Sequence, residues 1–346
     1  MRTYQKLTLV ILCGVGLVVI VLLYINLPNE TSNGFTRKFI PAKAQLLDSK
    51  TLPPFVRGMA GMHEDNLYFY TDSLNRLLKT NIRSLNNTTV SLPISRTLID
   101  RIGAAYSIKV TPKFVHVFAN NLPGIITVSR HSGNATIHTT KQTFTSEAVV
   151  SNTKFILRQY TPAHNGMQFV KMKTGSENIQ TESGLSLNDQ DRGMFSGDGQ
   201  LHYDSQTQLL VYTHYYYNAV LAFDCNLKPS IRFQTIDTVQ RFRNAQPHPL
   251  VINQKSCTDK GIVYICSNLK ADNETYKEYF ENIPVDLYQI ETGAYLGSIY
   301  LPLSNRKLIK SVLVNDQILA ALYHDGKLML FSIHHILQAL EPSVPL

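Results

Sequence analysis

The sequence contains no tryptophan, only four cysteines among 346 residues and no long run of lysine or arginine. The lack of tryptophan excludes repeat motifs that depend on it, such as the Trp-Asp repeat. The cysteines also lack the paired spacing of a zinc site. The net charge of +8 is moderate, so we expect no nucleic-acid partner, whereas an anionic ligand or an acidic protein surface would suit it.

Two common catalytic signatures are absent as well, because the chain has neither Gly-x-Ser-x-Gly nor His-Glu-x-x-His. These motifs mark serine hydrolases and zinc proteases, respectively. A fold could still bring separate acidic and histidine side chains together, among them His63, Asp198, His202 and Asp204. Solitary residues of this kind usually cap turns or face solvent. The sequence therefore favours a protein that is not an enzyme, with no resident cofactor or metal.

Three cysteines lie beyond the N-terminal region, and the sequence leaves their oxidation state open. Cys257 and Cys266 flank a short turn-like segment and could form a disulfide, which would leave Cys225 free or paired elsewhere. An oxidising compartment permits such a bond without requiring it. The alternative is that all three are buried, small apolar side chains.

The first part of the chain contains one long apolar run, Leu7–Ile25. Its length is close to the roughly 20 residues that a helix needs to cross a bilayer. Arg2 and Lys6 precede the run and no basic residue follows before Arg37. This charge bias predicts a cytoplasmic N-terminus and a periplasmic or extracellular remainder. A cleaved signal peptide and a lipidated Cys13 are the alternatives to an uncleaved transmembrane anchor.

Beyond this run the chain repeats one pattern about every forty to fifty-five residues, which is typical of repeat architectures. Each copy is an apolar, β-branched or aromatic segment, then a turn and a second such segment, as in a β-hairpin. Because every unit is all-β, the repeat favours a six-bladed β-propeller with four-stranded blades. The six hairpins are Asn66–Asn81, Lys113–Val128, Lys154–Met172, Gln208–Asp224, Gly261–Ile290 and Gln317–Ile333.

A propeller has to close its ring, because an unpaired sheet edge invites aggregation. The last hairpin is followed by His334–Leu340, which is long enough for one or two helical turns, so blade six lacks a fourth strand. We therefore expect the strand-like segment Phe35–Leu47 to supply it. The predicted divisions are residues 1–27 for the cytoplasmic stub and transmembrane anchor, 28–52 for a linker with the closing strand, 53–340 for the propeller and 341–346 for a tail.

Two segments carry a resemblance to known propellers. The pattern of strand, turn and strand that ends in aspartate, as in Tyr212–Asp224, resembles six-bladed propellers of the TolB-like and NHL/YWTD-like superfamily. The segment Val285–Tyr295 resembles the outer hairpin of membrane-tethered bacterial propellers, many of which are uncharacterised. The resemblance implies the fold over about residues 53–333. It carries over no catalytic residue, because the Tyr-Trp-Thr-Asp motif is absent and no catalytic motif matches.

Basic residues fall just before or on several segments that we expect to form innermost strands, which line the channel of a propeller. Converging guanidinium and ammonium groups would bind a carboxylate or a phosphate. The triplet Arg-Gly-Met even occurs twice, at Arg57 and at Arg192. The alternative is a set of scattered surface charges. The predicted ligand-binding residues are Arg57, Arg101, Arg192, Arg241 and Lys310.

Two aromatic segments are candidate partner surfaces. Tyrosines at the tip of the fourth hairpin offer flat apolar faces with polar hydroxyl groups, which suit contacts with protein or sugar. Rings that pack inward are the alternative. The polar insertion Asn268–Asn282 also carries tyrosines and is either a partner contact or a tolerated surface loop. The predicted partner-surface residues are Tyr215, Tyr216, Tyr217, Tyr276 and Tyr279.

Together these features predict a non-enzymatic, membrane-tethered binding or scaffold propeller in the extracytoplasmic space. We expect it to recognise a protein partner or a small anionic ligand. The alternative is a propeller hydrolase or lyase that acts on a sugar or lactone. Such an enzyme requires two carboxylates, or a histidine and a carboxylate, close together at the mouth of the channel.

Overall fold

A computed structural model describes residues 12–17, 32–120, 122, 124–140, 142–161, 166–174, 180–186, 197–239 and 250–340. The chain divides into two units, residues 1–33 and residues 34–346. In the first unit, residues 12–17 are helical. The predicted anchor Leu7–Ile25 lies mostly outside the described residues, and no helix within the described part is long and apolar enough to cross a membrane.

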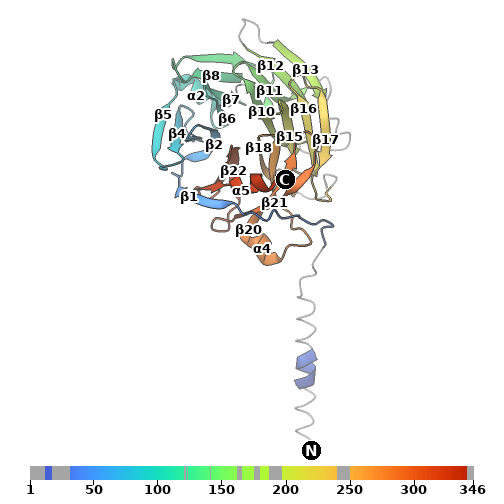
Figure 1. Ribbon diagram of the computed structural model, residues 1–346. Helices are drawn as coiled ribbons and strands as arrows, with labels where there is room; N and C mark the ends of the chain where they lie inside the picture. Colours follow the sequence, from blue (N-terminus) through green and yellow to red (C-terminus); the bar gives the residue numbers. More distant parts are fainter. Residues whose placement is uncertain are drawn as a thin grey trace, which may run out of the picture. The chain divides into compact units, whose positions relative to one another are not determined.

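The described residues of the second unit form six four-stranded antiparallel sheets, arranged as the blades of a propeller (Figure 1). Blades one to three comprise β2 (Val56–His63), β3 (Asn66–Thr71), β4 (Arg76–Asn81), β5 (Asn87–Ser91); β6 (Tyr106–Val110), β7 (Phe114–Ala119), β8 (Gly124–Ser129), β9 (Ala135–Thr139); β10 (Phe144–Ser151), β11 (Lys154–Thr161), β12 (Gly166–Lys173), β13 (Gln180–Ser186). Blades four to six comprise β14 (Gly199–Asp204), β15 (Leu209–His214), β16 (Ala219–Asp224), β17 (Pro229–Gln234); β18 (Asn253–Asp259), β19 (Ile262–Ser267), β20 (Asn282–Gln289), β21 (Tyr295–Pro302); β22 (Ile309–Asn315), β23 (Ile318–Tyr323), β24 (Lys327–Ser332) and β1 (Gln45–Thr51).

The six hairpins predicted from the sequence are the two middle strands of the six blades, so the predicted six-bladed propeller of four-stranded blades is confirmed. These strands are apolar on both faces because each blade is covered by a neighbour on either side. In β23, for example, every residue except Ile318 is buried. The turn between β23 and β24 uses Gly326 with φ +82°, a left-handed conformation that glycine adopts without steric cost.

The ring closes through β1, which pairs antiparallel with β24 and so supplies the fourth strand of blade six. An N-terminal strand closes the ring, as predicted, but the predicted residues Phe35–Leu47 are wrong for most of their length. The closing strand begins at Gln45, and the residues before it lie along blade five, where Ile40 N–H donates to the Ser298 carbonyl at 2.9 Å. Pro41 separates the two pairings, since proline lacks the N–H that a continuous ladder needs.

The segment that lies along blade five, residues 34–44, is held there by a buried arginine. Arg37 is only 3% exposed. Its Nε donates to Asp286 Oδ1 at 2.8 Å and its Nη1 donates to the Leu269 carbonyl at 2.9 Å and to the Glu274 carboxylate. Burial alone would lower the pKa of Arg37, but the carboxylates of Asp286 and Glu274 outweigh it and raise the pKa above its ordinary value. The guanidinium therefore stays charged and ties this segment to β20 and to the insertion of blade five.

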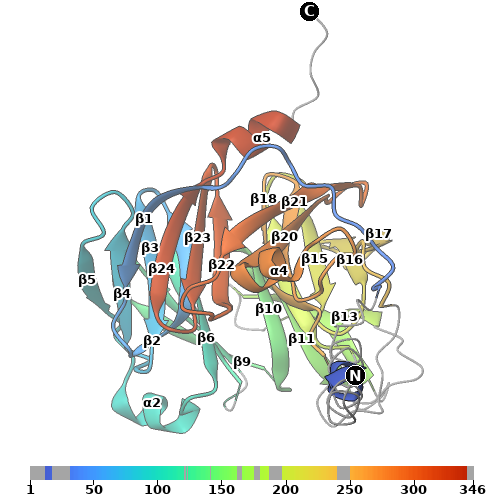
Figure 2. The same ribbon diagram turned by 90° about the horizontal axis from the view of Figure 1, so that it is seen from below.

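Helices flank the ring on both sides. Helix α2 (Arg96–Ile102) connects blades one and two and begins at Ser95, whose side chain accepts from Leu98 N–H. Helix α5 (His334–Leu340) follows the last hairpin, as predicted. Figure 2 shows α2 and α5 on opposite sides of the sheets, so they lie on the two faces of the ring. A third helix, α4 (Tyr276–Glu281), lies in the insertion of blade five.

Cys257 and Cys266 do not form the possible disulfide: both are buried free thiols, as in the alternative that the sequence left open. The strand register explains this result: Cys257 on β18 is opposite Tyr264, and Cys266 on β19 is opposite Lys255. The two cysteines are therefore diagonal rather than directly opposed neighbours. Cys225 is also a free thiol and is half-buried.

We predict that Arg37→Met destabilises the folded protein by about 3–5 kcal/mol, because it leaves two buried carboxylates without their counter-charge. Urea unfolding followed by circular dichroism measures the change in free energy. Lys38→Met is the matched control, since Lys38 is the next residue and has a long, positively charged side chain that is exposed. Equal stability of the two variants would contradict a structural role for the buried network.

Candidate functional site

The first strand of every blade faces the central channel, and polar contacts connect these inner strands to one another. Glu147 on β10 accepts from Ser107 Oγ on β6 at 2.6 Å. Lys310 on β22 donates from Nζ to the carbonyl of Val56 on β2 at 3.1 Å. Such bonds between neighbouring blades satisfy polar groups that the ring removes from bulk water.

The predicted ring of basic residues is brought together only in part. Arg57 and Lys310 are close neighbours on adjacent blades, and burial together with the charge of Arg57 lowers the pKa of Lys310. Arg101 instead lies on the exposed last turn of α2, before the inner strand β6 rather than on it. The helix forms there because Ser95 caps its start. Arg192 and Arg241 lie outside the described residues.

A cavity of about 250 Å³ lies within the channel and is lined by residues of all six inner strands. Sequence reasoning missed its charged residues, Lys109 and Glu147, and gave His202 no partner. Each of the three is the fourth residue of its inner strand, on β6, β10 and β14. An alignment of the inner strands of consecutive blades would have shown polar residues at one level of the channel.

Burial shifts the pKa values of His202 and Glu147 in opposite directions. Burial, together with the positive charge of Lys109, lowers the pKa of His202 to about 3. The imidazole is thus neutral, and its Nε2 contacts Ser256 Oγ on β18 at 2.9 Å. Burial raises the pKa of Glu147, whereas Lys109 and the Ser107 hydroxyl oppose that rise.

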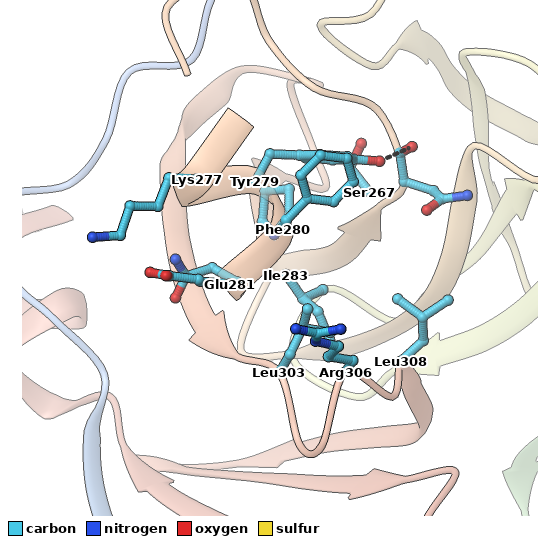
Figure 3. Close-up of a pocket in the computed structure, with 12 residues that line it drawn as sticks. Ser267, Lys277, Tyr279, Phe280, Glu281, Ile283, Leu303, Arg306 and Leu308 are labelled. Atoms are coloured by element: carbon cyan, nitrogen blue, oxygen red, sulfur yellow. Dashed lines mark hydrogen bonds between the residues drawn. The ribbon is translucent and has the colours of Figure 1, made fainter. Parts of the chain in front are cut away.

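A second and larger pocket, of about 660 Å³, lies beside the insertion of blade five (Figure 3). Its apolar lining includes Phe280, Ile283, Leu303 and Leu308, and the charged side chains at its edge are Lys277, Glu281 and Arg306. We call this pocket the insertion groove. It lies between α4 and the loop that connects β21 to β22.

Helix α4 is fixed in place by its own caps and side chains. Thr275 and Glu278 form a reciprocal capping box at its start. Tyr279, a predicted partner residue, donates its hydroxyl to the Asn268 carbonyl at 2.7 Å. Tyr276, the other predicted residue of this segment, has its ring stacked 5.9 Å from that of Phe280. Phe280 itself is 64% exposed, so a well-ordered helix presents a large apolar side chain to solvent.

The other predicted partner surface is largely packed into the fourth blade. Tyr217 is only 5% exposed, and its ring stacks 4.3 Å from that of His214. The prediction that Tyr217 belongs to a partner surface is therefore wrong, because this ring, in the turn between β15 and β16, packs inward against His214. Tyr215 and Tyr216 are half-buried, and burial raises the pKa of Tyr215 to about 12.

No protein-family model and no curated protein matches the chain, whereas solved structures match its fold. A member of the DUF4221 family from Bacteroides vulgatus is 13% identical, with a TM-score of 0.54 over 87% of this chain and 98% of its own. A catalytically inactive virginiamycin B lyase from Staphylococcus aureus, solved with quinupristin, is 11% identical, with a TM-score of 0.51 over 84% of this chain and 99% of its own. The Pan2 WD40 domain from Neurospora crassa is 10% identical, with a TM-score of 0.50 over 85% of this chain and 97% of its own.

These identities are low enough that the likeness establishes the fold alone. The strand order defines the class of the protein as a six-bladed β-propeller with four-stranded blades, and the solved structures share this fold.

We predict that His202 reduces stability in acid. The unfolded chain protonates a histidine near about pH 6.5, whereas the folded pKa is lowered to about 3. The stability linked to His202 is therefore present above about pH 6.5 and is lost as the pH falls toward the folded pKa, by up to about 1.4 kcal/mol per pH unit. His202→Gln, which retains a neutral partner for Ser256, should reduce this slope in urea unfolding between about pH 7 and pH 4.

His335→Gln is the control for this experiment, because His335 is exposed on α5. We expect His335→Gln to show the same change of unfolding free energy with pH as the wild-type protein. If His202→Gln shows that same change too, His202 is not held neutral in the folded state.

Proposed function

We propose that this propeller is a binding protein that recognises a protein partner through the insertion groove, and that its N-terminal apolar run holds it at a membrane in the extracytoplasmic space. The observation that carries the first part is the exposed Phe280 beside a pocket of about 660 Å³. A large aromatic side chain in water is unfavourable, and exposed apolar patches with polar rims are typical of interaction sites.

The groove is pre-organised for binding. Glu274, which precedes α4, is bound to the buried Arg37, and the Tyr300 hydroxyl donates to Glu274 Oε1 at 2.6 Å. At the other end of the helix, Asn282 Nδ2 donates to the Glu278 carbonyl at 2.9 Å. Because both ends of α4 are fixed, a partner loses little free energy in ordering this surface.

The charges at the groove favour an acidic partner segment. Lys277 and Arg306 lie at its edge with a single carboxylate, that of Glu281. Lys270 adds a further positive charge, with Nζ 4.9 Å from the centre of the Tyr276 ring. A partner with a large apolar residue next to aspartate or glutamate would fill the pocket and complement this charge.

The N-terminal part of the proposal rests on the sequence. The apolar run Leu7–Ile25 has the length of a membrane-spanning helix, and Arg2 and Lys6 before it favour a cytoplasmic N-terminus. In this arrangement the propeller would face partners outside the cytoplasm.

A channel lyase or hydrolase is a second candidate function. It is favoured by the juxtaposition of Glu147 and His202 on adjacent inner strands and by the likeness in fold to a virginiamycin B lyase. We place it second because each of these side chains already contacts a hydroxyl of a neighbouring blade, Ser107 and Ser256, respectively.

For the groove, we predict that peptides selected from a random display library against the full-length protein contain a large apolar residue beside an acidic one. Phe280→Ala and Arg306→Glu should each weaken binding of the selected peptide at least about tenfold, which corresponds to about 1.4 kcal/mol. Fluorescence anisotropy with a labelled peptide measures the affinity.

Ile137→Ala is the control for the groove variants, since Ile137 is an exposed apolar residue of β9 in blade two. Peptides that bind Phe280→Ala as tightly as the wild-type protein would place recognition elsewhere.

For the tether, we predict that the full chain remains in the membrane pellet after extraction with alkaline carbonate, whereas a variant that lacks residues 1–27 does not. The physical reason is that carbonate removes peripheral proteins but does not extract a spanning helix. Protease added to cells with a permeabilised outer layer and an intact cytoplasmic membrane should digest the propeller of the full chain. Release of the full chain by carbonate, or complete protection from protease, would contradict the proposed location.

A further inference from the structure

The channel cavity carries one charge of each sign. Of the residues that line its roughly 250 Å³, only Lys109 and Glu147 belong to the ordinarily charged types. The two histidines of the lining, His63 and His202, are kept neutral, because burial lowers the pKa of both. The remaining lining is apolar or carries neutral hydroxyl and amide groups.

Both charges have unused bonding capacity. Within the part of the chain that the structure describes, the side chain of Lys109 makes no hydrogen bond and no ion pair. Glu147 accepts one hydrogen bond, from Ser107 Oγ at 2.6 Å, although a carboxylate has about four acceptor sites. Lys109 and Glu147 influence each other electrostatically but do not form a direct ion pair in the described part of the chain.

A charge in a partly buried site is costly unless it is paired and hydrogen-bonded. A ligand between the two groups would pair both of them, provided that it carries a carboxylate for Lys109 and an ammonium group for Glu147. A simple anion would be repelled by Glu147, and a simple cation by Lys109. The cavity is also smaller than the roughly 300–1,000 Å³ of pockets for drug-sized ligands, so the ligand has to be small.

We propose that the channel binds a small zwitterion, namely a free amino acid or a comparable amino-carboxylate. Its carboxylate accepts from the Lys109 ammonium group, and its ammonium group donates to the free oxygen of Glu147. The neutral imidazole of His202 and the apolar lining contact the rest of the ligand. This site is independent of the insertion groove and uses none of its residues.

The test is a thermal-shift titration of the full-length protein with the common amino acids, each up to about 10 mM, because a ligand of the native state raises the melting temperature by mass action. Acetate and methylammonium serve as half-ligands that carry only one of the two charges. We expect at least one amino acid to give a saturable increase and both half-ligands to give none. Isothermal titration calorimetry then measures the affinity of that amino acid.

Lys109→Met and Glu147→Gln should each weaken its binding at least about tenfold, because each removes one charge-assisted hydrogen bond. Lys228→Met, at an exposed lysine before β17, and Phe280→Ala in the groove should bind the amino acid as the wild-type protein does. Circular dichroism of each variant shows whether the propeller is intact. If Lys109→Met fails to fold, Glu147→Gln still tests the proposal, because glutamine retains the shape of the side chain and an acceptor for the Ser107 hydroxyl.

Three results would overturn the proposal. They are the absence of a saturable shift with every amino acid, binding of acetate or methylammonium as tight as that of the best amino acid, and an unchanged affinity in the folded Glu147→Gln variant. None of them bears on peptide binding at the groove, so the two sites can fail separately.

Discussion

The pairing of β1 with β24 is the constraint on which the rest of the structure depends. Blade six is complete only when this N-terminal strand joins the hairpin from the C-terminal end of the chain, and without it the outer edge of β24 would be unpaired. Such a pairing brings together residues that are far apart in sequence, which costs loop-closure entropy. The residues before β1 then continue along blade five, where Arg37 is bound to Asp286 and Glu274. One segment therefore closes the ring and also fixes the insertion that carries α4.

Buried charge has two different roles in this propeller. Arg37 is compensated by two carboxylates and by a backbone carbonyl, so its contribution is structural. Lys109 lies in the channel without such compensation, and Glu147 is satisfied only in part. Uncompensated charge in a concave site is the arrangement that favours a ligand. The contrast within one fold separates the residues that stabilise blades from those that remain available for binding.

The two candidate sites are built in different ways. The insertion groove is formed by an addition to blade five and by a connecting loop, as is common for partner surfaces on a rigid scaffold. The channel cavity is formed by the inner strands of all six blades and exists only because the ring is closed. Since the sites share no residue, a partner at the groove and a small molecule in the channel need not exclude each other.

The sequence by itself determined the number of blades and the position of their middle hairpins, because these strands are local, apolar on both faces and joined by recognisable turns such as Asp325-Gly326. It also indicated that an N-terminal strand closes the ring. Only the tertiary structure decided where that strand begins, that Arg101 lies on a helix and that Tyr217 and the two cysteines of blade five are buried. It alone placed Lys109, Glu147 and His202 at one level of the channel. The reason is physical: hairpins follow from contacts between near neighbours in the chain, whereas a channel site joins residues from different blades whose relative positions depend on how the blades pack.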